Sequence, residues 1–355
     1  MKSLGNFPDP FIAEIAGQPD ALRRAAAGLA DQLPVLKALA GTVGERTLVF
    51  TGMGSSYDVC YPAVAQLARA GIPAIHVDAA ELLHFRRNLL GPSALLVAVS
   101  QSGESAEVVR VIDVDGVEDG PVVVAVTNGV DSTLAHAADL ALDTRAGEEI
   151  GPSTMTFAGA LVVVAAIGRT LAGEQPDAVV ARLVDDADSA AAAIERLLDL
   201  PSLPDELASW LDDRGASVIL GRGPARAAAE MGALTLKEAV GLPIESLETA
   251  QFRHGPLELA GPDLAAMLIA TEPETFDLDV RLAGELVASG ASVLIVTGAG
   301  DGPAEALRIP IGSLDSALAP AASILPAQLL AWKLAVRRGR SPGAYRRASK
   351  VTTRE

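Results

Sequence analysis

The chain has 355 residues, half of them hydrophobic and only 3% aromatic, which is enough for two domains with packed cores. Its formal net charge of −17 argues against nucleic acid as a partner, because that interaction depends on basic side chains. The single cysteine, Cys60, excludes an intramolecular disulfide and is typical of a reducing compartment. We expect Cys60 to be a small buried apolar residue.

The N-terminal residues include acidic side chains and lack the apolar stretch of a signal peptide. The longest apolar run, from Phe157 to Gly168, is too short to span a bilayer and is followed by Arg169. We therefore expect a cytoplasmic protein with no membrane partner. The histidines, at positions 76, 84, 136 and 254, show no metal-ligand spacing, so neither a metal nor a cofactor is expected.

Apolar runs alternate with helical patterns along the chain, which is typical of parallel α/β domains. In the first half, strands are expected at residues 47–52, 74–78, 94–100, 121–127 and 140–143. A helix is expected over residues 56–70 despite Pro62, and the pattern from residue 154 to residue 200 is helical. In the second half, strands are expected at residues 218–220, 244–248, 266–271, 293–297 and 307–310.

The second half of the chain repeats the first at an offset of close to 170 residues. Residues 71–84 align without a gap with residues 241–254, and a glycine pair follows the first strand of each half. A repeat of this length indicates two copies of a whole domain. We predict a helical N-terminal segment, two domains and a C-terminal tail, at residues 1–45, 46–200, 201–340 and 341–355.

A hydroxyl-rich loop, Ser100-Gln101-Ser102-Gly103-Glu104-Ser105, lies between a predicted buried strand and a predicted helix. Open α/β sheets bind ligands at this end of their strands, and helix N-termini favour anions. An ordinary helix N-cap is the alternative, but a cap needs only one hydroxyl. The loop therefore predicts recognition of a phosphate monoester. We expect Ser55 and Ser56, after the first strand, to form a second wall of the phosphate pocket.

The corresponding positions of the second copy carry different residues. Glu272-Pro273-Glu274-Thr275 replaces the hydroxyl-rich loop and cannot hold an anion. The turn Gly221-Arg222-Gly223 is interpreted as a tight connection between strand and helix. We therefore expect only the first copy to bind phosphate.

Two residues of the second copy could perform acid–base chemistry. Glu238 lies at the end of an apolar-periodic helix, where burial could raise its pKa for proton transfer. From the residues alone, an exposed charge on an amphipathic helix is the better interpretation of Glu238. His254 suits acid–base work on a sugar hydroxyl at neutral pH, and a structural histidine is equally compatible with its position.

The motifs, in chain order, are Gly54-Ser55-Ser56-Tyr57, the loop Ser100–Ser105, Glu149-Ile150-Gly151 with Ser153-Thr154, Leu236-Lys237-Glu238, His254-Gly255-Pro256 and Ser349-Lys350-Val351-Thr352. With these motifs in this order, the chain resembles the sugar isomerase (SIS) domain family over nearly its whole length. The resemblance is to the tandem-domain isomerase half of glucosamine-6-phosphate synthase and to the stand-alone glucosamine-6-phosphate deaminases. It implies two tandem flavodoxin-like α/β domains, each a three-layer αβα structure with a parallel sheet.

The resemblance also implies a role for each matching residue. The 6-phosphate would be held by Ser55, Ser56, Ser100, Gln101, Ser102 and Ser105. Glu238 would move a proton between C1 and C2, and His254 would open the sugar ring from the partner subunit of a homodimer with shared active sites. Ser153 would contact sugar hydroxyls, and the basic tail with Lys350 would fold over the site.

The chain also departs from the synthase. About 45 residues precede the first strand and none resembles a glutaminase domain, so we expect glutamine not to supply ammonia. Lys350 is a third candidate catalytic residue, although it lies one position out of register with the synthase lysine. Thr235 stands where the synthase has a lysine, and Met231 where it has a glutamate.

The sequence therefore predicts a phosphosugar isomerase acting on an amino sugar 6-phosphate, in particular a glucosamine-6-phosphate deaminase/isomerase that works through an enediol(amine). A deglycase for a fructosamine-type 6-phosphate is one alternative. A non-catalytic phosphosugar-binding sensor is the other, although such regulators carry a helix-turn-helix domain and the N-terminal segment is short and acidic.

Overall fold

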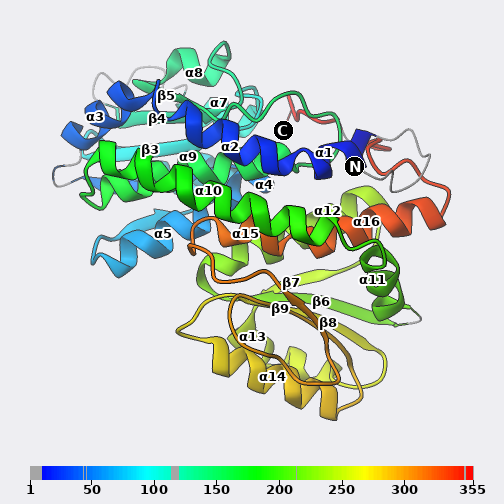
Figure 1. The fold of residues 1–355 in the computed structure, drawn as a ribbon. Helices are drawn as coiled ribbons and strands as arrows, with labels where there is room; N and C mark the ends of the chain where they lie inside the picture. Colours follow the sequence, from blue (N-terminus) through cyan, green and yellow to red (C-terminus); the bar gives the residue numbers. More distant parts are fainter. Residues whose placement is uncertain are drawn as a thin grey trace. The chain divides into compact units, whose positions relative to one another are not determined.

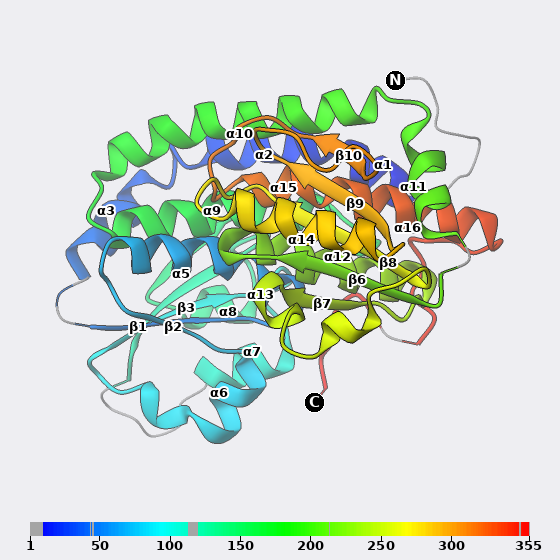
Figure 2. The same ribbon diagram turned by 90° about the horizontal axis from the view of Figure 1, so that it is seen from below.

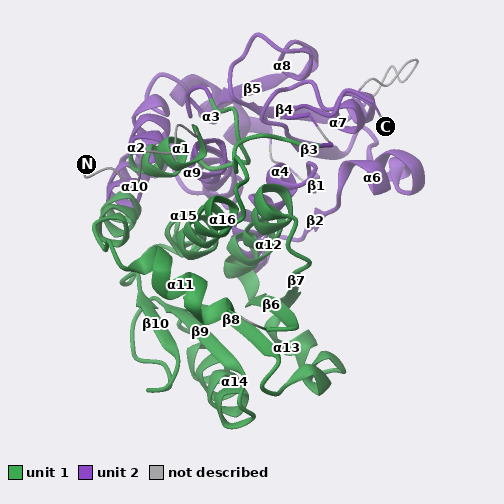
Figure 3. Cartoon of the chain, turned by 90° about the vertical axis from the view of Figure 1, so that its right-hand side faces the viewer, with its two compact units in different colours: residues 1–19, 149–154, 189–346 green, residues 20–148, 155–188, 347–355 purple. Residues whose placement is uncertain are grey.

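The computed structural model describes residues 10–42, 44, 46–112, 120–212, 214–347 and 349–354. Parts of the predicted N-terminal segment, residues 1–9, 43 and 45, lie outside the described residues. Two compact units are formed (Figure 3), and we treat each by itself. Unit 1 comprises Met1–Pro19, Glu149–Thr154 and Ser189–Arg346, and unit 2 comprises Asp20–Glu148, Met155–Asp188 and Arg347–Glu355. The domain boundaries drawn from the sequence remain predictions.

The sheet of unit 2 contains the five strands expected in the first half. They are β1 (Thr47–Thr51), β2 (Ala74–His76), β3 (Ala94–Val99), β4 (Val122–Thr127) and β5 (Leu140–Asp143). All neighbours are parallel and the order is β2-β1-β3-β4-β5. This is the doubly wound flavodoxin-like order, so the predicted fold class is confirmed for this copy.

Helices cover both faces of this sheet (Figures 1 and 2). One core joins the sheet to α6 (Ala79–Phe85), α7 (Ala106–Ile112) and α8 (Thr133–Ala137). On the other face, α9 (Met155–Leu171) packs against α5 (Cys60–Arg69), α3 (Leu33–Thr42) and β4. The remaining helical elements that begin or lie in this unit are α4 (Ser55–Asp58), the 3₁₀ helix η1 (Arg87–Leu89), α2 (Gln18–Gly28) and α10 (Pro176–Leu198).

Two details of unit 2 bear on the sequence predictions. The helix expected over residues 56–70 is divided at Val59, and Pro62 lies in the first turn of α5, where backbone N–H groups need no helical acceptor. Cys60 is fully buried, as expected, and burial raises the pKa of its thiol. The apolar run that contains Phe157 is the buried helix α9.

The sheet of unit 1 repeats this topology. Its strands are β6 (Ala216–Gly221), β7 (Glu245–Glu248), β8 (Leu264–Ala270), β9 (Ser292–Thr297) and β10 (Leu307–Pro310). All neighbours are parallel and the order is β10-β9-β8-β6-β7. Read from β7, this is the same strand order as in unit 2, and it confirms the predicted duplication.

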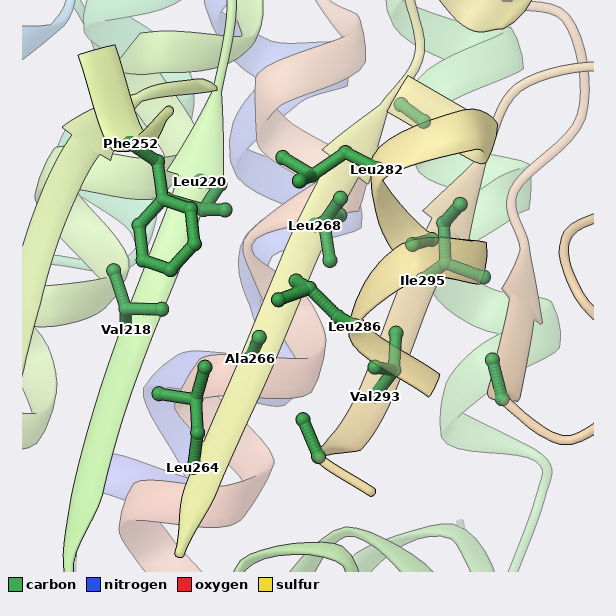
Figure 4. Packing of buried hydrophobic residues seen from close by; sticks show 14 residues of the cluster. Val218, Leu220, Phe252, Leu264, Ala266, Leu268, Leu282, Leu286, Val293 and Ile295 are labelled. Atoms are coloured by element: carbon green, nitrogen blue, oxygen red, sulfur yellow. The ribbon is translucent and has the colours of Figure 1, made fainter. Parts of the chain in front are cut away.

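The core of unit 1 shows why β6, β8 and β9 are mainly apolar. Alternate residues such as Leu220 and Leu268 pack against Leu282 and Leu286 of α14 (Phe276–Ala288), with Phe252 beside them (Figure 4). The opposite face packs against α12 (Arg226–Val240) and α11 (Leu203–Leu211). Burial of each large side chain stabilises the fold by about 1.5–3 kcal/mol. The other helical elements are α1 (Pro10–Ala16), η2 (Gly223–Ala225), α13 (Thr249–Phe252), η3 (Pro256–Leu259), α15 (Ala319–Ser323) and α16 (Leu325–Arg337).

One helical stretch of unit 1, Ala319–Arg337, is long and apolar enough to cross a membrane. The sequence analysis did not single out this stretch, because polar residues interrupt it and the longest uninterrupted apolar run lies elsewhere, from Phe157 to Gly168. In the structure 89% of its most apolar window is buried. A core helix passes the same test of length and composition.

Candidate active site

The turn after β1 places Ser55 and Ser56 at the carboxyl end of the first sheet. Gly52 approaches the next turn of chain so closely that a Cβ atom there would lie 2.6 Å from the carbonyl carbon and oxygen of Ser56. The chain then enters α4, which begins at Ser55. The glycine is therefore required for the close turn that presents both serines.

The loop after β3 is folded around its own hydroxyl groups. The hydroxyls of Ser100 and Ser105 lie 3.0 Å apart, and the Gly103 N–H donates to Ser100 Oγ over 3.2 Å. Ser102 Oγ accepts the N–H of Glu104 over 3.1 Å. The loop is followed directly by α7, as the sequence predicts. The hydroxyl of Ser100, which is buried, thus shapes the loop from within.

One pocket in unit 2 gathers part of the predicted phosphate site. Ser55, Ser56 and Gln101 line it, together with Val99, Val126, Thr144, Thr156 and Ala160. It has a volume of about 10 Å³, room for about one water molecule, so it is a recess in the loop surface. Ser100, Ser102 and Ser105 are not among its lining residues.

Two lining threonines were missed in the sequence. Thr144 directly follows β5 and donates its hydroxyl to Asn128 Oδ1 over 3.0 Å. Thr156 lies in the first turn of α9. Thr144 could have been predicted from its position at the carboxyl end of an expected strand, because ligand-binding residues gather there in parallel sheets.

Glu104 connects the loop to α8. Its carboxylate accepts the N–H of Thr133 over 2.7 Å and the Thr133 hydroxyl over 2.8 Å. These two hydrogen bonds hold the pKa of Glu104 below its usual value, the backbone one being the larger cause. The structure gives a positioning role to a residue that the sequence interpretation left without one.

The C-terminal tail contacts this region within unit 2. The carbonyl of Thr352 accepts the N–H of Ala106, the first residue of α7, over 3.0 Å. The Ser349 hydroxyl donates to the carbonyl of Val351 over 2.6 Å. Lys350 is half-buried in this segment. The tail therefore reaches the helix that follows the hydroxyl-rich loop.

In unit 1, Glu238 lies in the last turn of α12 and is exposed. Burial of the helix end, the sequence argument for proton transfer, is therefore absent at this residue. The Arg340 guanidinium donates to the carbonyl of Val240 at the end of the same helix. A cation at a helix C-terminus stabilises that end of the helix.

Thr235 and Met231, the two departures from the synthase, are fully buried on the same helix. The Thr235 hydroxyl donates to the carbonyl of Met231 over 2.9 Å. Neither residue therefore presents a functional group at the surface of α12.

Ser153 lies in the loop Glu149–Thr154, which belongs to unit 1. Glu149 Oε1 accepts both the N–H and the hydroxyl of Thr154, over 2.7 and 2.9 Å. Tyr345, which the sequence did not single out, donates its hydroxyl to the carbonyl of Gly151 over 3.2 Å. Burial raises the pKa of Tyr345, and the charges of Glu238, Glu149 and Glu14 raise it further.

His254 follows α13 and is exposed. Its ring is therefore not part of the core, and its catalytic role stays a prediction. Within its own unit, His254 lies on a loop separate from the end of α12.

The turn after β6 holds an ion-pair cluster. Arg222 Nε donates to Asp279 Oδ1 over 2.6 Å, and its guanidinium lies 3.3 Å from Glu248. Glu272 is also buried, and its Oε2 accepts the hydroxyl of Ser316 over 3.0 Å. Within the described ranges, no group of three or more His, Cys, Asp or Glu side chains could hold a metal ion.

The model of the SIS domain matches residues 43–168 and again residues 211–338. The chain belongs to the SIS domain family. The chain is similar to the isomerizing glutamine–fructose-6-phosphate aminotransferases of Pyrobaculum aerophilum (31% identity over 100% of this chain and 59% of the relative) and Thermococcus kodakarensis (28%, over 100% and 60%). It thus spans about three fifths of the length of these relatives.

Solved structures show the same fold. The C-terminal domain of glucosamine-fructose-6-phosphate aminotransferase from Francisella tularensis matches with a TM-score of 0.84 and 23% identity, over 97% of this chain and 99% of that one. The glucosamine-6-phosphate deaminase of Thermotoga maritima matches with a TM-score of 0.70 and 20% identity, over 96% and 98%. The predicted tandem architecture and family resemblance are confirmed.

Proposed function

We propose that this protein is a phosphosugar isomerase that acts on an amino sugar 6-phosphate, in particular a glucosamine-6-phosphate deaminase/isomerase. The observation that carries the proposal is the recess at the carboxyl end of the first sheet, where Ser55, Ser56 and Gln101 converge. Neutral donors suit a phosphate group on a protein with a net charge of −17, because such a protein has no global positive field to attract an anion. The names of the relatives and of the Thermotoga maritima neighbour support the substrate class.

In this proposal Ser55, Ser56, Gln101 and the hydroxyls of the Ser100–Ser105 loop hold the 6-phosphate. Glu238 takes the proton from C2 and returns it at C1 through an enediol(amine), which exchanges aldose for ketose. Water then adds to the C2 imine that this transfer produces and ammonia leaves, so that glucosamine 6-phosphate and water give fructose 6-phosphate and ammonia. His254 protonates the ring oxygen during opening, and Lys350 acts beside the substrate from the tail.

The deciding experiment incubates the purified protein with glucosamine 6-phosphate and measures ammonia and fructose 6-phosphate. We expect equal release of both by the wild type and a loss of at least about 100-fold in kcat for Glu238→Gln. Glu245→Gln, an exposed glutamate at the start of β7, is the matched control and should retain activity. Retained turnover in Glu238→Gln contradicts the proton-transfer role.

The outcomes also separate the alternatives. Thermal stabilisation by glucosamine 6-phosphate without turnover favours the phosphosugar sensor, whereas turnover of a fructosamine-type 6-phosphate alone favours the deglycase. Cytoplasmic location and homodimeric assembly belong to the same proposal. For the dimer, mixed Glu238→Gln and His254→Ala subunits should recover part of the activity, and heterodimers without recovery contradict shared active sites.

A further inference from the structure

Side chains from opposite ends of the chain meet at Gly151 within unit 1. From α1, the Glu14 carboxylate accepts the N–H of Ile150 over 2.6 Å and the N–H of Gly151 over 3.1 Å. From the segment after α16, the Tyr345 hydroxyl donates to the carbonyl of Gly151 over 3.2 Å. Both backbone polar groups of one residue are therefore bound by side chains that lie 137 and 194 positions away in the sequence.

The packing around Gly151 leaves no room for a side chain. A Cβ atom at this residue would lie 2.8 Å from Glu14 Oε2 and 3.3 Å from the Cα atom of Gly343. Glu14 and Gly151 are buried, and Tyr345 is half-buried. Since buried polar groups are costly to leave unpaired, these hydrogen bonds should keep the loop and the segment around Tyr345 in one arrangement.

The two ends of the loop are also hydrogen-bonded to each other. Glu149 binds the N–H and the hydroxyl of Thr154 with one carboxylate oxygen. Ser153, which lies between these anchored residues, is half-buried. Its position therefore depends on contacts made by its neighbours.

The surroundings of the phenol are acidic. Burial is the main reason why the pKa of Tyr345 is raised, and the carboxylates of Glu238, Glu149 and Glu14 add to it in that order. Tyr345 therefore stays protonated and remains a donor at any physiological pH.

We propose that Tyr345 and Glu14 form a clamp on Gly151 that positions the loop Glu149–Thr154, and with it Ser153, for the reaction proposed above. Tyr345 is a positioning residue, since its hydroxyl acts on the loop backbone. The existence of the clamp rests on the contacts alone, whereas its effect on turnover rests on the proposed function.

The test compares Tyr345→Phe, which removes one hydroxyl, with Tyr61→Phe, which removes a hydroxyl in α5 of unit 2. In Tyr345→Phe we expect amide hydrogen exchange in residues 149–154 to become about 5-fold faster, as for the loss of one hydrogen bond. We expect kcat to fall about 5- to 10-fold with KM changed less than about 2-fold, because the phosphate-binding residues are untouched. Tyr61→Phe should change neither the loop exchange nor kcat.

Glu14→Gln provides an independent variant, because it replaces one of the two carboxylate oxygens that accept the Gly151 N–H, at 3.1 and 3.3 Å, by an NH₂ group that cannot accept it. The double variant should exchange little faster than either single one, since both changes open the same clamp. Unchanged loop exchange in both single variants overturns the clamp, and faster exchange with unchanged kcat overturns its role in the reaction. If the wild type shows no turnover, the proposed function fails while hydrogen exchange still decides on the clamp.

Discussion

At the carboxyl end of β3 in unit 2 the chain places serine hydroxyls, and the nearby recess is lined by hydroxyl and amide groups together with the apolar side chains of Val99, Val126 and Ala160. At the carboxyl ends of β6 and β8 in unit 1, which hold the same places in an identical strand order, it places Arg222 and Glu272. The guanidinium of Arg222 is already paired with Asp279 and Glu248. The carboxyl ends of β1 and β3, here called the first edge, carry uncharged donors that we propose bind phosphate. The carboxyl ends of β6 and β8, the second edge, carry a cation that is paired with carboxylates of the chain itself.

This difference shows how a duplicated fold acquires one specialised site. Parallel sheets of this order bind ligands where the strand order reverses, so both copies inherit a suitable position. In unit 1 the ion pairs occupy that position. In unit 2 the position is left to small polar side chains, which stabilise less and can exchange partners with a ligand.

The largest effect on stability should come from breaking the ion pair between Arg222 and Asp279 at the second edge. Arg222→Gln leaves the buried carboxylate of Asp279 and the neighbouring carboxylate of Glu248 without their shared cation, so we expect the free energy of unfolding to fall by about 3 kcal/mol. Asp277→Asn, an exposed change in the same turn of α14 as Asp279, is the control and should have little effect. Chemical denaturation measures both, and stabilisation by glucosamine 6-phosphate should persist in each variant.

The Asp279 carboxyl gives the wild type a defined pH dependence of stability. Burial raises the pKa of Asp279 above its ordinary value of 3.8, and outweighs the attraction of Arg222. In the window from 3.8 up to the raised pKa, the folded state holds a proton that the unfolded state has released. The contribution of Asp279 to stability should therefore decline as the pH rises through this window. If the Asp279→Asn variant keeps the same pH slope as the wild type, this assignment is contradicted.

The next largest effect on stability is expected from replacing either of two glycines that lie in corresponding turns of the two units. A Cβ atom at Gly52 would lie 2.6 Å from the Ser56 backbone, and one at Gly221 would lie 2.8 Å from the carbonyl oxygen of Ala225. Each change to alanine should lower the free energy of unfolding by about 1–3 kcal/mol through overpacking. Thermal shift with glucosamine 6-phosphate should be lost in Gly52→Ala alone. Loss in Gly221→Ala alone would reverse the functional assignment of the two edges.

The sequence predicted the fold well because buried parallel strands are continuous apolar runs, as in β3 and β8. It predicted the hydroxyl-rich loop because such loops directly follow those strands. It could not predict the Tyr345 contact, because Tyr345 and Gly151 are 194 residues apart and no local pattern encodes their meeting. The exposed position of Glu238 agrees with the interpretation from the residues alone, an exposed charge on an amphipathic helix, and its role in proton transfer stays a prediction.

The smallest effect on stability is expected for a change of Glu104, in the loop after β3 at the first edge. The pKa of this carboxyl lies below the usual 4.5, because Thr133 donates two hydrogen bonds to its ionised form. Its contribution to stability is therefore fully present above pH 4.5 and is lost as the pH falls through the lowered pKa, the reverse of the slope at Asp279.

Because Glu104 is exposed, Glu104→Gln should lower stability by less than about 1 kcal/mol, while the loop should bind glucosamine 6-phosphate more weakly. Glu274→Gln, an exposed change in the corresponding loop of unit 1, is the control. Titration calorimetry at about pH 7 decides the matter: if both variants bind with the same Kd as the wild type, the link between Glu104 and Thr133 does not position the loop.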